Sequence, residues 1–195
     1  DSGAIKVDEY LRTQYDNIYA VGDVAGPYQF THTASHMAWY AAVNALFGVF
    51  WRFKVDYSVI PACTFTSPEV ARVGLNEQQA RLQDIAFEVT VFELSDLDRA
   101  RIDQQTEGFV KVLTPPGKDR ILGVTIVGSH AGEVISEFTL AMKNRIGLNQ
   151  VLSTIHIYPT FAEMNKFVAG AHRREHKPEW ALRLAERFHR VRRGK

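Results

Sequence analysis

The hydrophobic pattern of the chain changes character near residue 54. Before that point it contains a short apolar run at 18–21, closed by Gly22 and Asp23, and a long one at 37–53. The short run predicts a buried strand that ends in a tight turn. The long run predicts a buried helix. It is too short to span a membrane, and three polar or small residues interrupt it.

Beyond Ile60 the runs become short and alternating, which is the pattern of strands. They predict strands at 63–66, 70–74, 87–94, 108–113 and 121–127. The Pro-Pro-Gly turn at 115–117 makes the last two antiparallel neighbours. Asn76 caps a short polar helix, and apolar residues at helical spacing predict a longer one over 131–142.

The stretch 154–166 combines a proline turn with the start of another helix. Pro159 disfavours helical backbone at Tyr158, so the chain before it is expected to be extended. Thr160 and Glu163 have the spacing of a capping box, which predicts a helix that begins with Thr160 as its N-cap. By residues alone this indicates a capped helix that presents Tyr158 just before its first turn.

Together these elements predict an α+β fold with an antiparallel sheet and flanking helices. We expect a first region at 1–53, a linker at 54–58, the sheet region at 55–170 and a tail at 171–195. In the tail, residues 179–191 predict an amphipathic basic helix. Its apolar stripe is formed by Trp180, Leu184 and Phe188.

Charge is distributed unevenly along the 195 residues. The net charge is +1, but 171–195 carry nine Lys or Arg against three Asp or Glu, net +6, which leaves net −5 on 1–170. We interpret the tail as a helix that packs on its own protein. We expect the protein to bind no nucleic acid and to have no membrane span. A membrane-surface or nucleic-acid contact is the alternative, since arginines flank an apolar stripe.

Cys63 is the single cysteine, so the chain cannot form an internal disulfide or a multi-cysteine zinc site. We expect Cys63 to be a buried, small apolar residue and the protein to be cytoplasmic. No metal site is predicted. The chain opens on Asp1 without a signal pattern, and we expect it to be a piece of a longer protein.

Three stretches resemble the pyridine nucleotide-disulfide oxidoreductase family, in particular its mercuric reductase-like and dihydrolipoamide dehydrogenase-like members. Residues 13–24, which include Tyr-Ala-Val-Gly-Asp-Val, resemble the second flavin-binding motif. Residues 158–163, Tyr-Pro-Thr-Phe-Ala-Glu, resemble the His-Pro-Thr-x-x-Glu interface motif. Residues 60–75 are similar to the start of the dimerisation domain.

The resemblance implies that 1–53 end an α/β flavin-binding domain and that 55–170 form the dimerisation domain of a homodimer. FAD is the implied cofactor, and the NAD(P)H site and the remaining FAD and NAD(P) domains lie outside this chain. A helix N-terminus aimed at the flavin favours negative charge on it. The implied FAD-binding residues are Gly22, Asp23, Thr31, His32, Thr33 and Ala34.

The resemblance also implies catalytic candidates, with one departure. Tyr158 stands where disulfide reductases have the histidine that acts as acid and base, and Glu163 is the glutamate that orients it. A phenol is a poor base at neutral pH. His156, two residues earlier in an extended segment, is a further candidate because it shares a face with Tyr158.

The tyrosine at this position is similar to the one in mercuric reductase. This sequence, however, has no C-terminal cysteine pair like that of mercuric reductase. Because soft metals need thiolate ligands, we do not expect mercury to be the substrate. The implied parent passes electrons from NAD(P)H through FAD to a disulfide or metal acceptor, and the chain alone does not turn over. The alternative is a non-catalytic oligomerisation module of a divergent member.

Overall fold

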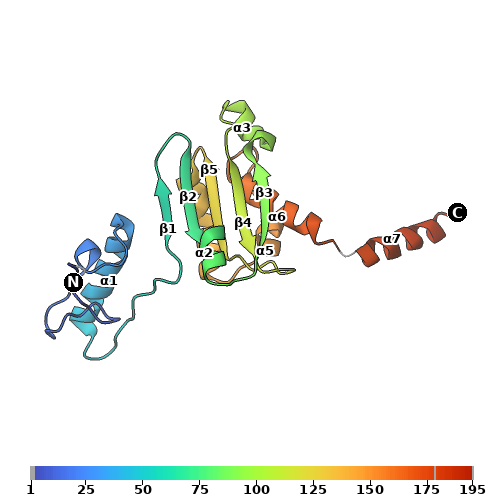
Figure 1. Ribbon diagram of the computed structural model, residues 1–195. Helices are drawn as coiled ribbons and strands as arrows, with labels where there is room; N and C mark the ends of the chain where they lie inside the picture. Colours follow the sequence, from blue (N-terminus) through green and yellow to red (C-terminus); the bar gives the residue numbers. More distant parts are fainter. Residues whose placement is uncertain (1–2, 178, 195) are drawn as a thin grey trace. The chain divides into compact units, whose positions relative to one another are not determined.

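The computed structural model describes residues 3–177 and 179–194. The chain divides into two compact units, Asp1–Ile60 and Pro61–Lys195, called here the N-terminal and the C-terminal unit (Figure 1).

The N-terminal unit is built around one helix, α1 (Thr31–Phe47), preceded by the 3-10 turn η1 (Gly22–Val24). Met37 of α1 packs with Leu11 and Ala41 in a small buried cluster. The strand expected at 18–21 is present only as an isolated bridge between Arg12 and Tyr19. That prediction was wrong in extent, because a strand persists only where neighbouring strands pair with it.

The helix predicted over 37–53 ends at Phe47 and is not buried throughout. Its end is fastened by Asn44, a buried side chain. The Asn44 amide donates to the carbonyls of Tyr10 and Phe53 at 3.1 and 2.9 Å, and its oxygen accepts from the Phe53 N–H at 2.8 Å. One amide therefore ties together three segments that lie apart in the sequence.

The C-terminal unit contains a five-stranded sheet in the order β1-β2-β5-β4-β3, and every neighbouring pair is antiparallel. Its strands are β1 (Pro61–Thr64), β2 (Glu69–Gly74), β3 (Glu88–Glu93), β4 (Phe109–Thr114) and β5 (Gly123–Gly128). The predicted antiparallel α+β fold is confirmed, as is the pairing of β4 with β5. The first strand begins two residues earlier than predicted.

In the part of this unit that the structure describes, the remaining elements are helical. They are α2 (Glu77–Leu82), η2 (Leu94–Asp96), α3 (Asp98–Ile102), α4 (Ala131–Lys143), α5 (Leu148–Ser153), α6 (Glu163–Glu175) and α7 (Glu179–Arg192). Figure 1 shows α4 and α6 together behind the sheet and α2 in front of it. The predicted capping box at Asn76 of α2 is confirmed.

The core lies between the sheet and the α4–α6 layer. Alternate residues of the central strands point into it, among them Val110 and Val112 of β4 and Ile126 of β5, all buried. Phe138 of α4 and Met164 of α6 meet them from the other side and are also buried. This burial of large apolar side chains is the main source of the unit's stability.

Helix α6 runs across the boundary expected at residue 170 and ends at Glu175. The predicted amphipathic helix in the tail is present as α7. Leu184 and Phe188 of its stripe are exposed, so the interpretation that the stripe packs on the protein was wrong for these two residues. The side chain of Trp180, the third member of the predicted stripe, lies outside the described residues. Among the helices the structure describes, none is long and apolar enough to cross a membrane.

Candidate functional site

Tyr158 lies on the loop between α5 and α6, and it is 66% exposed. Its hydroxyl donates to the Asp98 carboxylate at 3.1 Å, at the first residue of α3. This hydrogen bond and the negative charge of Asp98 raise the pKa of the Tyr158 phenol. Tyr158 is therefore a neutral hydrogen-bond donor at physiological pH, and it is held in place by a carboxylate that sequence reasoning missed.

Glu163 is buried at the start of α6, and its carboxylate accepts from the backbone N–H of Thr160 at 3.2 Å. The other half of the predicted capping box is absent, because the Thr160 hydroxyl donates backwards to the Ile157 carbonyl at 2.6 Å. The N-cap is Ala162. The prediction that Thr160 caps the helix was wrong, since its hydroxyl is used to close the preceding turn.

His156 and Tyr158 contact different carboxylates, because His156 lies against Glu137 and Tyr158 binds Asp98. Its side chain is only 5% exposed, and its Nε2 lies 3.0 Å from the Glu137 carboxylate of α4. Its Nδ1 lies 3.1 Å from the carbonyl of Thr154. Both ring nitrogens are engaged with oxygen acceptors, so this geometry anchors the loop to α4.

Asn165 completes this anchor from α6. Its side-chain amide donates to Glu137 at 2.8 Å and to the Val134 carbonyl at 3.2 Å. Glu137 thus joins the Tyr158 loop, α4 and α6 through His156 and Asn165. Sequence reasoning missed Glu137 and Asn165, because a polar residue on a helix gives no signal that it meets a side chain 19 or 28 positions away.

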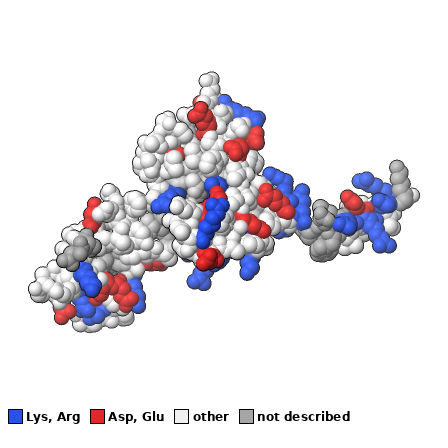
Figure 2. Space-filling model, viewed as in Figure 1, with Lys and Arg blue, Asp and Glu red and all other residues white. Residues whose placement is uncertain are grey.

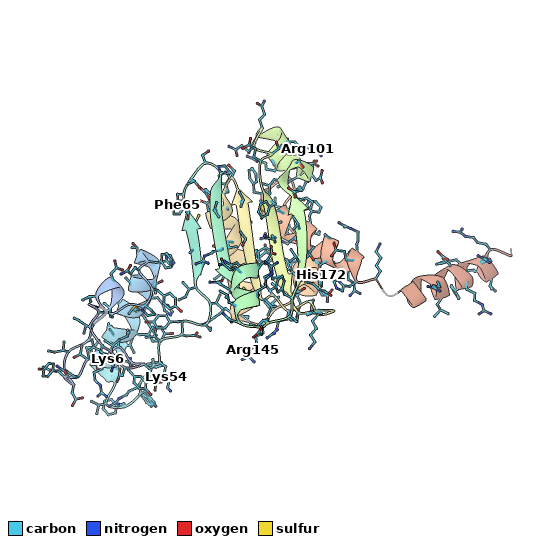
Figure 3. The ribbon with its side chains drawn as sticks, in the orientation of Figure 1. Lys6, Lys54, Phe65, Arg101, Arg145 and His172 are labelled. Carbon is cyan, nitrogen blue, oxygen red and sulfur yellow. The ribbon has the colours of Figure 1, made fainter. Side chains whose placement is uncertain are left out.

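A second polar cluster joins α6 to β3, where Figure 3 labels His172. His172 is buried, and its Nδ1 lies 3.4 Å from the Thr90 hydroxyl. His176 at the end of α6 places Nε2 2.7 Å from Glu88. Burial lowers the pKa of His172, whereas the His172 carbonyl and Glu88 raise the pKa of His176.

The predicted FAD residues gather in the N-terminal unit where η1 meets the start of α1. Gly22 has φ +72°, and a Cβ there would lie 3.1 Å from the Cβ of Ala34. A side chain would strain this position, so glycine allows η1 to approach the helix closely. Asp23, the next residue, presents its carboxylate at the surface.

The first turn of α1 begins without a side-chain cap, because the N-cap residue is Phe30. Thr31 and His32 are exposed, and the His32 ring stacks on Phe30 at a centroid distance of 5.1 Å. Thr33 is buried, and its hydroxyl has no hydrogen-bond partner within the described part of the chain. The start of α1 is therefore without a side-chain cap.

These residues fit one end of a polyhydroxylated, anionic cofactor. Asp23 is an acceptor beside a glycine, and an uncapped helix of 17 residues supplies backbone donors and a positive dipole end. The unpaired Thr33 hydroxyl is a further polar group near the helix start. The fit covers only the groups that this chain contributes.

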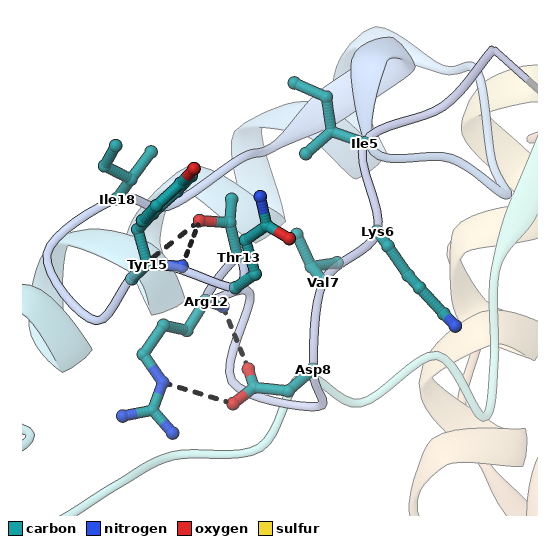
Figure 4. A pocket seen from close by; sticks show the side chains of 9 residues that line it. Ile5, Lys6, Val7, Asp8, Arg12, Thr13, Tyr15 and Ile18 are labelled. Carbon is teal, nitrogen blue, oxygen red and sulfur yellow. Dashed lines mark hydrogen bonds and ion pairs between the residues drawn. The ribbon is translucent and has the colours of Figure 1, made fainter.

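A hollow of about 630 Å³ also lies in the N-terminal unit, at a different place (Figure 4). Its wall includes Ile5, Val7 and Ile18, and Arg12 pairs there with Asp8 at 3.4 Å. None of the predicted FAD residues lines it. It is a largely apolar surface hollow beside the isolated bridge.

Cys63 is half-buried, and burial together with nearby carboxylates raises the pKa of its thiol. The expectation of a buried small residue therefore holds only in part. Within residues 3–177 and 179–194, no group of three or more His, Cys, Asp or Glu is placed to hold a metal ion.

Comparisons with known proteins cover both units. The family described as "Pyridine nucleotide-disulphide oxidoreductase, dimerisation domain" matches residues 60–168, and "Pyridine nucleotide-disulphide oxidoreductase" matches residues 1–38. Dihydrolipoyl dehydrogenase of Chlamydia muridarum is 38% identical over 164 residues, which are 84% of this chain and 35% of the relative. Mercuric reductase of Shewanella putrefaciens is 35% identical over 167 residues, 86% of this chain and 29% of the relative.

Solved structures give the same picture. LpdA from Mycobacterium tuberculosis superimposes with a TM-score of 0.77 at 26% identity, covering 86% of this chain and 36% of that one. The Cu(II) complex of the HOCl-induced flavoprotein disulfide reductase RclA from Escherichia coli gives 0.78 at 28% identity, covering 86% and 38%. The chain spans about a third of the length of the curated dihydrolipoyl dehydrogenases it matches.

Proposed function

The chain belongs to the pyridine nucleotide-disulphide oxidoreductase family, and we propose that it is the C-terminal part of a flavin-dependent, NAD(P)H-linked enzyme. The parent passes electrons to a disulfide or metal acceptor. Residues 1–53 close its FAD domain, 55–170 are its dimerisation domain and 171–195 are a basic tail. The supporting observation is the exposed, Asp98-bound phenol of Tyr158 on a loop that His156 anchors to α4.

The N-terminal unit contributes the end of the cofactor site. Asp23 accepts hydrogen bonds from hydroxyls of FAD, and the start of α1 places backbone donors and a positive dipole end beside the flavin. Bound FAD supplies the redox chemistry between the nicotinamide and the acceptor. The NAD(P)H site and the upstream FAD and NAD(P) domains belong to chain outside this sequence.

The C-terminal unit brings two such chains together as a homodimer and presents Tyr158 to the partner's site. The one hydrogen of the phenol is donated to Asp98, which fixes where the phenol points, so the phenol offers the lone pairs of its oxygen to the acceptor. Glu163 holds the turn before α6 through the Thr160 N–H. His156 acts with Glu137 as a positioning pair for the loop. The single cysteine supports a cytoplasmic, reducing location.

The dimer is tested by light scattering on the 195-residue chain at micromolar concentration. We expect the mass of two chains, because a two-fold interface is self-complementary and needs no other subunit. A stable monomer under these conditions would count against the dimerisation role.

The catalytic role is tested by Tyr158→Phe in the full-length parent. Removal of the hydroxyl is expected to lower turnover by about tenfold or more if the phenol acts on the reacting groups. Asp98→Asn is the matched variant, since it retains the phenol and alters only its partner, and it is expected to have a smaller effect. Unchanged turnover with Tyr158→Phe would favour the alternative, a non-catalytic oligomerisation module whose parent lacks the paired redox cysteines.

A further inference from the structure

Helix α7 carries an apolar stripe at its surface. Leu184, Phe188 and Val191 are 62%, 61% and 74% exposed. Their spacing of four and three residues places them on one face of a helix that runs from Glu179 to Arg192. A contiguous exposed row of large apolar side chains marks a contact surface.

The rest of the helix is cationic. Residues 179–195 contain six Lys or Arg and two Glu, net +4 with histidine neutral. At 3.6 residues per turn, Arg187 and Arg192 border the apolar stripe on its two sides, and Arg190 lies on the opposite face. Figure 2 shows the blue side chains gathered on this C-terminal segment.

We propose that α7 binds an anionic lipid surface and lies in its plane. A helix with an apolar stripe between arginines buries that stripe at the boundary of headgroups and acyl chains, while the long arginine stems keep their charges among the phosphates. The net positive charge is complementary to anionic headgroups. The chain itself, through its C-terminal helix, thus provides a peripheral membrane anchor.

The composition of the stripe favours lipid over nucleic acid. Binding to a phosphate backbone uses the Lys and Arg charges and leaves exposed Leu184, Phe188 and Val191 without a function. A membrane span is excluded for α7, because 14 residues extend only about 21 Å and four of them are arginines. The proposal does not depend on the electron acceptor of the parent.

The test is sedimentation of the full 195-residue chain with phosphatidylcholine vesicles, with and without phosphatidylserine. We expect binding only with phosphatidylserine, and weaker binding as salt is raised. The variant Leu184→Asp/Phe188→Asp is expected to lose binding. Leu82→Asp, on the exposed end of α2, is the matched control and should bind like the unmodified chain. Arg187→Gln/Arg192→Gln is expected to weaken binding by roughly 30-fold.

Three outcomes would overturn the proposal. One is the absence of sedimentation with phosphatidylserine vesicles at low salt. Another is equal binding by the Leu184→Asp/Phe188→Asp variant, with circular dichroism showing that all variants are folded. The third is tighter binding to duplex DNA than to vesicles, unchanged by Phe188→Asp, which would identify a nucleic-acid contact instead.

Discussion

The two units of this chain differ in how far each one encloses its own apolar side chains. In the C-terminal unit the largest core residue, Phe138, is fully buried between α4 and the sheet. In the N-terminal unit the buried cluster is small, and large apolar side chains remain at the surface: Trp39, Leu46, Phe47, Val49, Phe50, Trp51 and Phe53. The C-terminal unit thus has a large core of its own beside the apolar side chains that it exposes, whereas the N-terminal unit has a small core and presents a concentration of exposed apolar side chains as a contact surface.

The comparison is tested most strongly by Phe138→Ala. Removing this side chain leaves a cavity in the core, and we expect the free energy of unfolding of the C-terminal unit to fall by about 3–5 kcal/mol. Denaturant titration followed by circular dichroism measures it. Phe50→Ala is the control, because Phe50 is exposed in the N-terminal unit and its removal should cost almost nothing. Similar losses for both variants would break the contrast.

Asn44→Ala tests what holds the N-terminal unit together. It leaves the carbonyls of Tyr10 and Phe53 and one N–H without their partner, which is expected to cost about 1–3 kcal/mol. Hydrogen exchange should then speed up over 44–57 and remain unchanged in β4 and β5. Asn144→Ala, at the exposed end of α4, is the matched control. Unaltered exchange would mean that the apolar cluster alone suffices.

Thr33→Val is expected to act in the opposite direction and to stabilise the N-terminal unit. The Thr33 hydroxyl is buried and has no hydrogen-bond partner among the described residues, so replacing it by a methyl group should stabilise the N-terminal unit by about 1 kcal/mol. Thr114→Val is the counterpart in β4, where the hydroxyl is likewise buried and unpaired. If Thr33 serves the cofactor, the full-length Thr33→Val parent should bind FAD more weakly while Thr114→Val binds it normally. Melting curves and flavin content measure the two effects.

The smallest expected effect is the pH dependence of the His176–Glu88 pair in the C-terminal unit. The pKa of His176 is raised above 6.5, so its contribution is complete below that pH and is lost as pH rises through the folded value. The Gly117 N–H and His176 lower the pKa of Glu88 below 4.5, so its contribution is lost as pH falls through the folded value. The pair therefore stabilises most between about pH 4.5 and 6.5.

His176→Gln is expected to remove at most about 0.5–1 kcal/mol in that window, because Glu88 is 40% exposed and solvent screens the pair. His172 acts in the opposite sense, since burial lowers its pKa, so the difference between variant and unmodified chain is the quantity to measure. A difference that is the same at pH 5.5 and pH 8.5 would show that the pair is not charged when folded.

The sequence was sufficient to predict the sheet but not the contacts around Tyr158. Alternation with turn residues locates β2, β4 and β5 because the side-chain period of two is a local property. The Asp98 partner lies 60 positions from Tyr158, on a five-residue helix with no period to detect. Thr160 has the correct spacing for an N-cap, but its hydroxyl donates to the carbonyl of Ile157 instead.

The strand order leaves β1 and β3 as the two edges of the sheet, and their sequences bear on aggregation. An edge strand is a template for pairing with a foreign strand. β1 is four residues long and starts with Pro61, which has no backbone N–H to offer, and β3 begins and ends with glutamates. Both edges thus discourage strand addition, so we expect the C-terminal unit to resist fibrillar assembly even when it is produced without the N-terminal unit.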